Sequence, residues 1–198
     1  MRRRRDRVRA PVRGLDSGSA VRAFIAFELS PAVRSALAGL MADLRDRFAG
    51  LRWVRPESVH LTLRFLGESS PVQIDRLRDS LGPLAARCPR AEAVFCGLGL
   101  FPERGRPSVL WLGVELPEPL VALQAACEAA AVAAGFPGEP RPFSPHLTLG
   151  RWRDRAARPE LPAVDLGSTL LDALVLMRSE LRPEGAVYTH LQRFELPG

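Results

Sequence analysis

The chain contains only three histidines, and two of them begin the same tetrapeptide. The letters H-L-T-L occur at residues 60–63 and again at residues 146–149. An imidazole titrates near neutral pH, so it can take up or release a proton there. A threonine hydroxyl can donate a hydrogen bond to a phosphoryl oxygen. Because this histidine–threonine pair occurs twice in a chain with so few histidines, we predict a site with two sides.

Strand geometry places the polar residues of each tetrapeptide together. Successive side chains of a strand point to opposite faces, so His60 and Thr62 share one face, about 6.6–6.8 Å apart along the strand. His146 and Thr148 do the same, and the leucines of both copies point the other way, into the core. If the two halves pack about a pseudo-twofold axis, the four polar side chains meet in one cleft.

Two facing imidazoles suit the opening of a cyclic phosphodiester. A neutral histidine takes a proton from water while a protonated one gives a proton to the leaving oxygen, and each transfer contributes about 10²–10⁴-fold. Threonine hydroxyls can hold the phosphoryl oxygens, and an arginine can offset the developing charge. We therefore predict acid–base catalysis that needs no cofactor and no metal. The near-identical motifs do not themselves say which histidine is the acid.

Three further residues are candidates for substrate binding. Arg64 shares the face of His60 by simple alternation. Arg151 has the wrong parity relative to His146, but Gly150 permits a bulge that would re-aim it. Phe143, just before the second motif, could stack on a base or pack in the core.

Other interpretations of the histidines remain open at this point. A single H-x-T could be an ordinary strand pair whose histidine caps a carbonyl, but two copies on a duplicated scaffold favour a site. A metal site built on His60 and His146 is a second alternative, although no Asp, Glu or Cys stands at ligand spacing beside either. His190 has no twin and is interpreted as structural or exposed.

The two halves of the chain follow one plan. Residues 21–29 form a strand-like run that ends at Ser30-Pro31, a typical helix start. Residues 109–116 form a second such run, and Pro117-Glu118-Pro119 begins a second helix. Its amphipathic spacing predicts a buried stripe formed by Leu120, Leu123, Cys127, Ala130 and Ala134. The Glu-Leu pairs that close the two strands lie 87 residues apart, and the two motif histidines lie 86 apart. This offset, preserved to within one residue, indicates a duplication.

The remaining segments alternate in the same way. We expect a helix that opens at Ser70-Pro71 and is broken or kinked near Gly82-Pro83. Further strands and loops are predicted as follows: strands at 93–100, 170–178 and 185–196, and loops at 103–107 and 153–167. Short strands interleaved with helices predict an α+β fold.

Composition bounds the class of protein. The 198 residues carry a net charge of +6, and residues 1–13, with seven Arg and one Asp, account for all of it. We predict a disordered basic tail at 1–20 and one bilobal domain at 21–198. The tail is a loose hold on RNA phosphates, a solvated arm, or translated sequence upstream of a true start near Val21. All 28 basic residues are Arg, which indicates a GC-rich bacterial genome.

Localisation is predicted from what the chain does not contain. No apolar run approaches the ~18–20 residues of a membrane span, and no apolar segment follows the basic N-terminus. The three cysteines are odd in number and match no metal-ligand spacing. We expect reduced thiols and a cytoplasmic, monomeric protein.

Three longer stretches make the chain resemble the LigT-like branch of the 2H phosphoesterases. They are R-A-F-I-A-F-E-L-S-P, R-W-V-R-P-E-S-V-H-L-T-L-R-F-L-G-E and F-S-P-H-L-T-L-G-R. The resemblance runs from about Val21 to Leu196 and is closest to bacterial RNA 2′,3′-cyclic phosphodiesterases, also called 2′-5′ RNA ligases. It implies a pseudo-twofold bilobal fold in which two antiparallel sheets with outer helices surround a central cleft.

The resemblance also implies roles and a substrate. His60 would be the proton donor to the ribose oxygen, His146 the proton acceptor that activates water, and Thr62 and Thr148 the phosphate ligands. RNA with a 2′,3′-cyclic phosphate end would be opened to a 2′-phosphate. Alternatives are 2′-5′ joining of RNA ends, hydrolysis of a small cyclic phosphate, and binding of RNA ends without turnover.

Overall fold

A computed structural model describes residues 20–154, 157–182 and 185–198, so residues 1–19 of the tail predicted at 1–20 lie outside the described residues. The elements follow in this order: β1 (Val21–Phe27), α1 (Pro31–Asp43), the 3₁₀ turn η1 (Arg45–Arg47), β2 (Leu51–Trp53), the 3₁₀ turn η2 (Pro56–Ser58), β3 (Leu61–Ser69), α2 (Pro71–Ala85), β4 (Ala91–Phe101), β5 (Val109–Glu115), α3 (Glu118–Ala133), β6 (His146–Trp152), β7 (Asp165–Leu171), β8 (Ala173–Arg182) and β9 (Gly185–Glu195). The predicted α+β class is confirmed.

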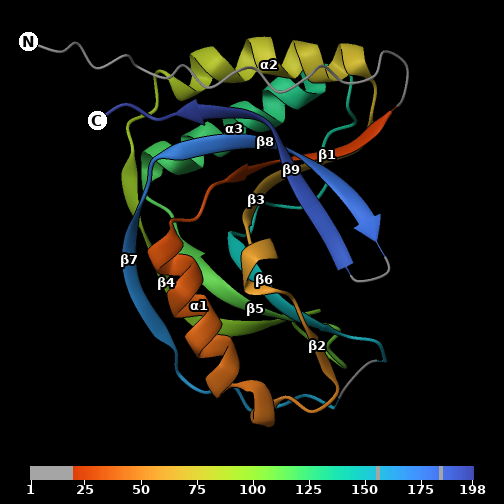
Figure 1. Ribbon diagram of the computed structural model, residues 1–198, viewed down its shortest axis with the longest axis vertical. Helices are drawn as coiled ribbons and strands as arrows, with labels where there is room; N and C mark the ends of the chain where they lie inside the picture. The colour runs from red at the N-terminus through yellow and green to blue at the C-terminus, as the bar shows by residue number, and fades with distance from the viewer. Residues whose placement is uncertain (1–19, 155–156, 183–184) are drawn as a thin grey trace, which may run out of the picture.

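The strands form two antiparallel halves that meet at the motif strands (Figure 1). One half runs β7-β4-β5-β6 and the other β3-β1-β8-β9, with β2 added beside β6. The halves join where Leu61 of β3 stands opposite Leu147 of β6. These two leucines hold the same place in the two tetrapeptides, so the junction has the symmetry that the duplication predicts.

Helices α1 and α3 each pack on the half of the sheet that does not contain the strand preceding them in the chain. α3 follows β5 in the chain but packs on β3, and α1 follows β1 but packs against β7. α2 lies beside α3 and contacts β8 and β9, so these two helices cover one half while α1 covers the other (Figure 1). This exchange ties the halves together at their outer faces.

Local signals explain where the helices begin. The Ser30 side chain accepts a hydrogen bond from the Val33 backbone N–H at the start of α1. Ser70 and Gln73 form a reciprocal capping box at the start of α2. The buried stripe of α3 is the predicted one, with Leu120, Leu123, Cys127, Ala130 and Ala134 all inside.

None of the described helices is long and apolar enough to cross a membrane.

Three details differ from the sequence expectations. α2 continues through Pro83 to Ala85 rather than breaking, because Pro83 lies close to the C-terminal end, where little helix is left to disrupt. The segment predicted as one strand at 170–178 is divided between β7 and β8, with Asp172 between them. β7 begins at Asp165, inside the predicted loop. Its polar sequence does not indicate a strand, but antiparallel pairing with β4 makes it one.

Candidate active site

The twin motifs line one cavity. Leu61 and Leu147 are fully buried in the core, so the histidines and threonines beside them face the opposite side of the sheet. There they border a cavity of about 140 Å³ whose lining residues are Val54, Ser58, Val59, His60, Thr62, Phe65, His146, Thr148, Arg151 and Tyr188. The structure therefore brings all four motif side chains together, as alternation and pseudo-symmetry predicted.

The His60 ring is fixed from two sides. Its Nδ1 lies 2.9 Å from the backbone carbonyl of Ser58. Phe24 of β1 stacks on the ring with centroids 4.5 Å apart, and Tyr188 of β9 meets it edge-on at 4.8 Å. Burial lowers the pKa of His60 below its ordinary value of 6.5, and the positive charge of Arg34 lowers it further, while the Ser58 hydrogen bond opposes both effects.

His146 is held in the same manner by different residues. Its Nδ1 lies 2.7 Å from the carbonyl of Ser144, again two residues earlier. Phe101 meets the ring edge-on at 5.0 Å and Trp111 lies tilted at 6.1 Å. Burial lowers the pKa of His146, the Ser144 carbonyl raises it, and Arg151 lowers it.

These contacts define which nitrogen can react. A carbonyl only accepts hydrogen bonds, so Nδ1 of each ring carries the hydrogen and donates it. In the neutral ring Nε2 is then the unprotonated base, and in the charged ring Nε2 carries the transferable proton. Among the described residues that line the cavity, none carries a carboxylate. A phosphate anion between the rings would therefore raise both pKa values toward the range where proton transfer is efficient.

The threonines complete the polar floor of the cavity. Both are half-buried. Within the part of the chain that the structure describes, neither hydroxyl has a hydrogen-bond partner in the protein. They are available as donors to a phosphoryl oxygen, although their role as phosphate ligands stays a prediction.

A β-bulge in β3 overturns the expected position of Arg64. Ala26 stands opposite Thr62 but Ile25 stands opposite Arg64, so Leu63 is an extra residue in the ladder. Gln124 of α3 donates a side-chain hydrogen bond to the Leu63 carbonyl at 3.3 Å. Beyond the bulge the alternation is shifted. Arg64 therefore turns away from the cavity, although simple alternation placed it beside His60.

Arg64 instead joins β3 to α3 and to the loop before β6. It is only 7% exposed, with Nε 2.5 Å from a Glu128 carboxylate oxygen and Nη1 3.7 Å from that of Glu139. Its other donors bond the carbonyls of Phe65 and Pro137. The Glu128 carboxylate also accepts from the Glu139 backbone N–H at 2.9 Å. Arg64 thus links the first motif strand to the segment that leads into the second.

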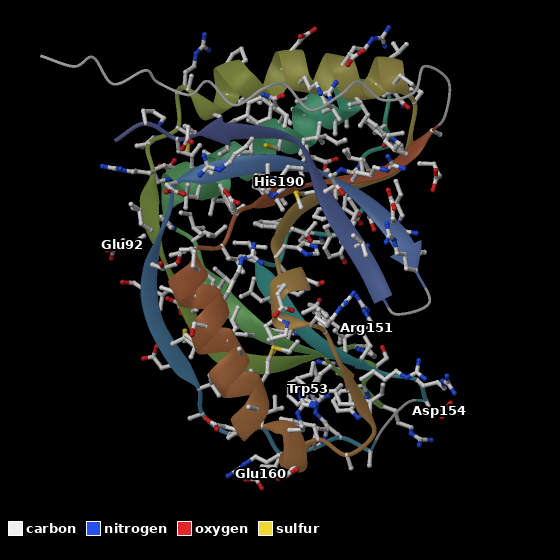
Figure 2. All side chains as sticks on the ribbon, in the orientation of Figure 1. Trp53, Glu92, Arg151, Asp154, Glu160 and His190 are labelled. Atoms are coloured by element: carbon white, nitrogen blue, oxygen red, sulfur yellow. The ribbon has the colours of Figure 1, made fainter. Side chains whose placement is uncertain are left out.

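A matching bulge in β6 brings Arg151 into the cavity, as Gly150 had suggested. Leu110 stands opposite Gly150 and Trp111 opposite Thr148, so Leu149 is the extra residue. The Val54 backbone N–H donates to the Leu149 carbonyl at 2.9 Å. Arg151 then lines the cavity from β6, where it is labelled in Figure 2. Its role in substrate binding remains a prediction.

Three aromatic residues complete the comparison with the sequence predictions. Phe143 is half-buried against the main core and does not line the cavity, so the packing alternative describes its position. Phe65 and Tyr188 do line it, and sequence reasoning assigned neither to the site. Alternation placed Phe65 in the core, and the hidden bulge reversed it. Tyr188 comes from β9, and no local signal connects it with the motifs.

Two further features lie outside this cavity. A larger groove of about 550 Å³, with Arg47, Trp152 and Arg153 in its lining, contains none of the motif residues. The His190 side chain, on β9, is 42% exposed, and its Nε2 lies 3.8 Å from the Glu28 carboxylate. This position agrees with the prediction that His190 is structural or exposed. Among the described residues, no three His, Cys, Asp or Glu side chains cluster closely enough to hold a metal ion.

Known proteins share this sequence and fold over most of the chain. The family described as LigT like Phosphoesterase matches residues 27–111 and 113–188. An RNA 2′,3′-cyclic phosphodiesterase of Thermus thermophilus is 37% identical over 189 residues, covering 90% of this chain and 91% of that protein. The protein of the same name from Methanothermobacter thermautotrophicus is 34% identical over 183 residues, covering 89% and 99%.

Solved structures give the same result. The crystal structure of the Thermus thermophilus protein TT0787 superposes with a TM-score of 0.78 at 35% identity, covering 89% of this chain and 98% of that one. The crystal structure of E. coli LigT complexed with 3′-AMP gives 0.79 at 27% identity, covering 90% and 99%. The chain therefore shares its fold with TT0787 of Thermus thermophilus and with E. coli LigT.

Proposed function

The chain belongs to the family of LigT-like phosphoesterases, and we propose that it hydrolyses 2′,3′-cyclic phosphate ends of RNA to 2′-phosphate ends. The similar proteins of Thermus and Methanothermobacter carry the name of this activity. The observation that carries the proposal is that His60 and His146 line one cavity, each with Nδ1 occupied by a carbonyl and Nε2 left to react.

The reaction follows from the two rings. Nε2 of neutral His146 takes a proton from water as the water oxygen bonds to phosphorus. The bond from phosphorus to the ribose O3′ breaks, and Nε2 of protonated His60 gives its proton to that oxygen. One water is consumed, and a 2′-phosphate and a 3′-hydroxyl are formed. The family resemblance supplies the direction, since the two imidazoles are held alike.

The other polar groups would stabilise charge on the phosphoryl group. Thr62 and Thr148 are placed to donate to its non-bridging oxygens from the two motif strands. Arg151 supplies the single formal positive charge among the described cavity-lining side chains when both histidines are neutral. A preorganised donor of this kind can contribute about 10²–10³-fold.

An RNA oligonucleotide ending in a 2′,3′-cyclic phosphate tests the proposal. The wild type should yield a product whose terminal phosphate a phosphatase removes, and turnover should persist in EDTA. His60→Ala and His146→Ala should each lose at least about 100-fold in kcat. Full activity in both variants would refute the site. Loss of activity on chelation, restored by added metal, would refute the metal-free mechanism.

The same assay separates the alternatives. A joined, phosphatase-resistant product from two RNA ends would indicate 2′-5′ ligation. Turnover of only small cyclic phosphates would indicate a small-molecule hydrolase. Salt-sensitive binding without any product would indicate an RNA-end binding protein.

We further propose that the protein acts as a monomer in the cytoplasm on RNA ends. Its described cysteines are all free, with Cys88 and Cys127 buried, which suits a reducing compartment. Light scattering at micromolar concentration checks the oligomeric state, and a dimer mass would contradict it.

A further inference from the structure

Arg34 of α1 holds the turn that precedes the first motif histidine. Its side chain is half-buried and does not line the cavity. Nη1 donates to the backbone carbonyl of Glu57 at 2.8 Å and to that of Val59 at 3.5 Å. These carbonyls flank Ser58, whose own carbonyl accepts the hydrogen bond from Nδ1 of His60. One guanidinium therefore holds the peptide groups on both sides of the acceptor that orients the ring.

The guanidinium is itself anchored at the end of β1. Its Nε donates to the Leu29 carbonyl at 3.2 Å, and Leu29 is 2% exposed in the core. Hydrogen bonds from a charged donor are about twice as strong as neutral ones. Arg34 thus connects a fixed point of the core with the turn η2.

The two halves of the molecule differ at this point. His146 is the first residue of β6, and the Val114 backbone N–H donates to the carbonyl of the preceding Pro145 at 3.2 Å. His60 lies one residue before β3, whose pairing with β1 ends at Leu61. Backbone pairing therefore fixes the segment before the second histidine, whereas a side chain fixes the segment before the first.

The duplicated plan gives the second half no counterpart of this side chain. Arg34 lies six residues after Glu28, and the residue six positions after Glu115 is Val121. Val121 is 43% exposed on α3, and its side chain has no hydrogen-bond donor. Arg34 is thus a feature of the proton-donating half alone.

The same guanidinium places a cation near His60. Burial lowers the pKa of this ring most, and the charge of Arg34 lowers it further. The other titratable or charged groups that face the ring are His146 and Arg151 of β6 and Tyr188 of β9. A neighbouring cation makes a protonated imidazole a stronger acid, which suits a group that gives a proton to a leaving oxygen.

We propose that Arg34 is the positioning residue of His60: it sets the turn η2 and, through the Ser58 carbonyl, directs Nε2 of the ring into the cavity. This inference rests on the proposed function and adds to it a residue that substrate does not touch. Because Arg34 acts through the acid, it affects proton donation and leaves substrate binding unchanged.

Nitrogen-15 NMR of the imidazoles tests the positioning on the free protein. In the wild type, neutral His60 and neutral His146 should both carry their proton on Nδ1. In Arg34→Met the His60 ring should populate both tautomers, while His146 keeps one. Arg34→Lys keeps a cation but loses the fork of donors, so its His60 should lie between the two.

Kinetics on RNA ending in a 2′,3′-cyclic phosphate test the consequence. A general acid contributes about 10²–10⁴-fold, so Arg34→Met should lower kcat by about tenfold or more and leave KM unchanged. Added to His60→Ala, the same change should lower kcat no further, because the group that it positions is gone. A merely structural role would lower kcat by the same factor in both backgrounds.

The matched control is Arg78→Met, since Arg78 of α2 is 32% exposed and donates to the Leu191 carbonyl at 3.4 Å. It should change neither ring and neither kinetic constant. A single Nδ1–H tautomer of His60 in Arg34→Met, an equal change at His146, or an unchanged kcat would overturn the proposal. If Arg34→Met does not fold, the same readings on Arg34→Lys decide. An inactive wild type would refute the proposed function, while the NMR comparison still decides the positioning.

Discussion

Replacing Arg64 with methionine distinguishes the position that strand alternation predicts from the one that the structure shows. Methionine keeps the apolar stem and removes the guanidinium, so Glu128 and Glu139 lose their cation and two backbone carbonyls lose a donor. If Arg64 faced the cavity, the variant would lose substrate binding and keep its stability. In the structure it should lose stability first.

The burial of the three side chains sets the magnitude. Removing one partner of a buried ion pair costs about 3–5 kcal/mol, whereas an exposed pair is worth about 0–1 kcal/mol. Arg64 is 7% exposed, but Glu128 and Glu139 are 26% and 30% exposed, so water replaces part of what the acids lose. We expect a loss of about 2–3 kcal/mol, which is about 4–12 °C in melting temperature for a chain of this length.

Urea denaturation and thermal melting measure this loss, and kcat/KM is taken well below the melting temperature. Arg182→Met is the matched control, because Arg182 pairs with Glu180 at 3.0 Å while 55% exposed. It should change the free energy of unfolding by less than about 1 kcal/mol. An Arg64→Met variant as stable as the wild type but at least tenfold lower in kcat/KM would refute the structural argument and restore the phosphate-binding prediction.

Three further predictions concern the motif strands. Folding lowers the pKa of His60 and His146 from 6.5, so the unfolded chain binds protons more readily than the folded one. The free energy of unfolding should therefore fall as the pH drops from about 8 to about 5. In urea denaturation this free energy should depend less steeply on pH in the double variant His60→Gln/His146→Gln, and an equal pH dependence would contradict the argument. Gly150→Ala should cost about 1–3 kcal/mol in a thermal melt, because its Cβ would lie 2.7 Å from Leu51 Cγ; an unchanged melting temperature would mean that β2 shifts freely. Leu147→Ala should cost about 2–5 kcal/mol in urea denaturation, because this fully buried side chain packs where the two halves join; a loss below about 1 kcal/mol would show that the junction carries little packing.

The sequence was sufficient for the parts of the site that depend on periodicity. Alternation placed His60 with Thr62 and His146 with Thr148, and the nearly equal offsets between the halves predicted that the two pairs would meet. The extra residue of each bulge is the fourth residue of its motif, so alternation holds over the first three residues, which include both the histidine and the threonine. The leucines confirm it, since Leu61 and Leu147 are fully buried at the junction.

The predicted position of Arg64 was wrong because the β-ladder gains an extra residue immediately before it. Arg64 and Gly150 each follow their motif by one position, and each comes directly after the extra residue of a bulge. Gly150 signalled the bulge because glycine tolerates a close approach, here to Leu51. Arg64 gave no such signal. Its bulge is supported from outside β3, by the Gln124 side chain and the two acids beyond it, and such long-range support is not visible in local sequence.

The paired bulges also explain how a duplicated motif can serve an asymmetric reaction. Each bulge directs the fifth residue after its histidine into the cavity, and that residue is Phe65 in the first half but Arg151 in the second. One side of the cavity therefore carries an apolar ring at this position, while the other side carries a cation. Burial lowers the pKa of His146 and the charge of Arg151 lowers it further, while burial and the charge of Arg34 act in the same direction on His60. The two identical tetrapeptides therefore stand beside different side chains at the fifth position. We expect the double variant Phe65→Arg/Arg151→Phe to lower kcat/KM in the cyclic-phosphate assay more than Thr62→Ala or Thr148→Ala does.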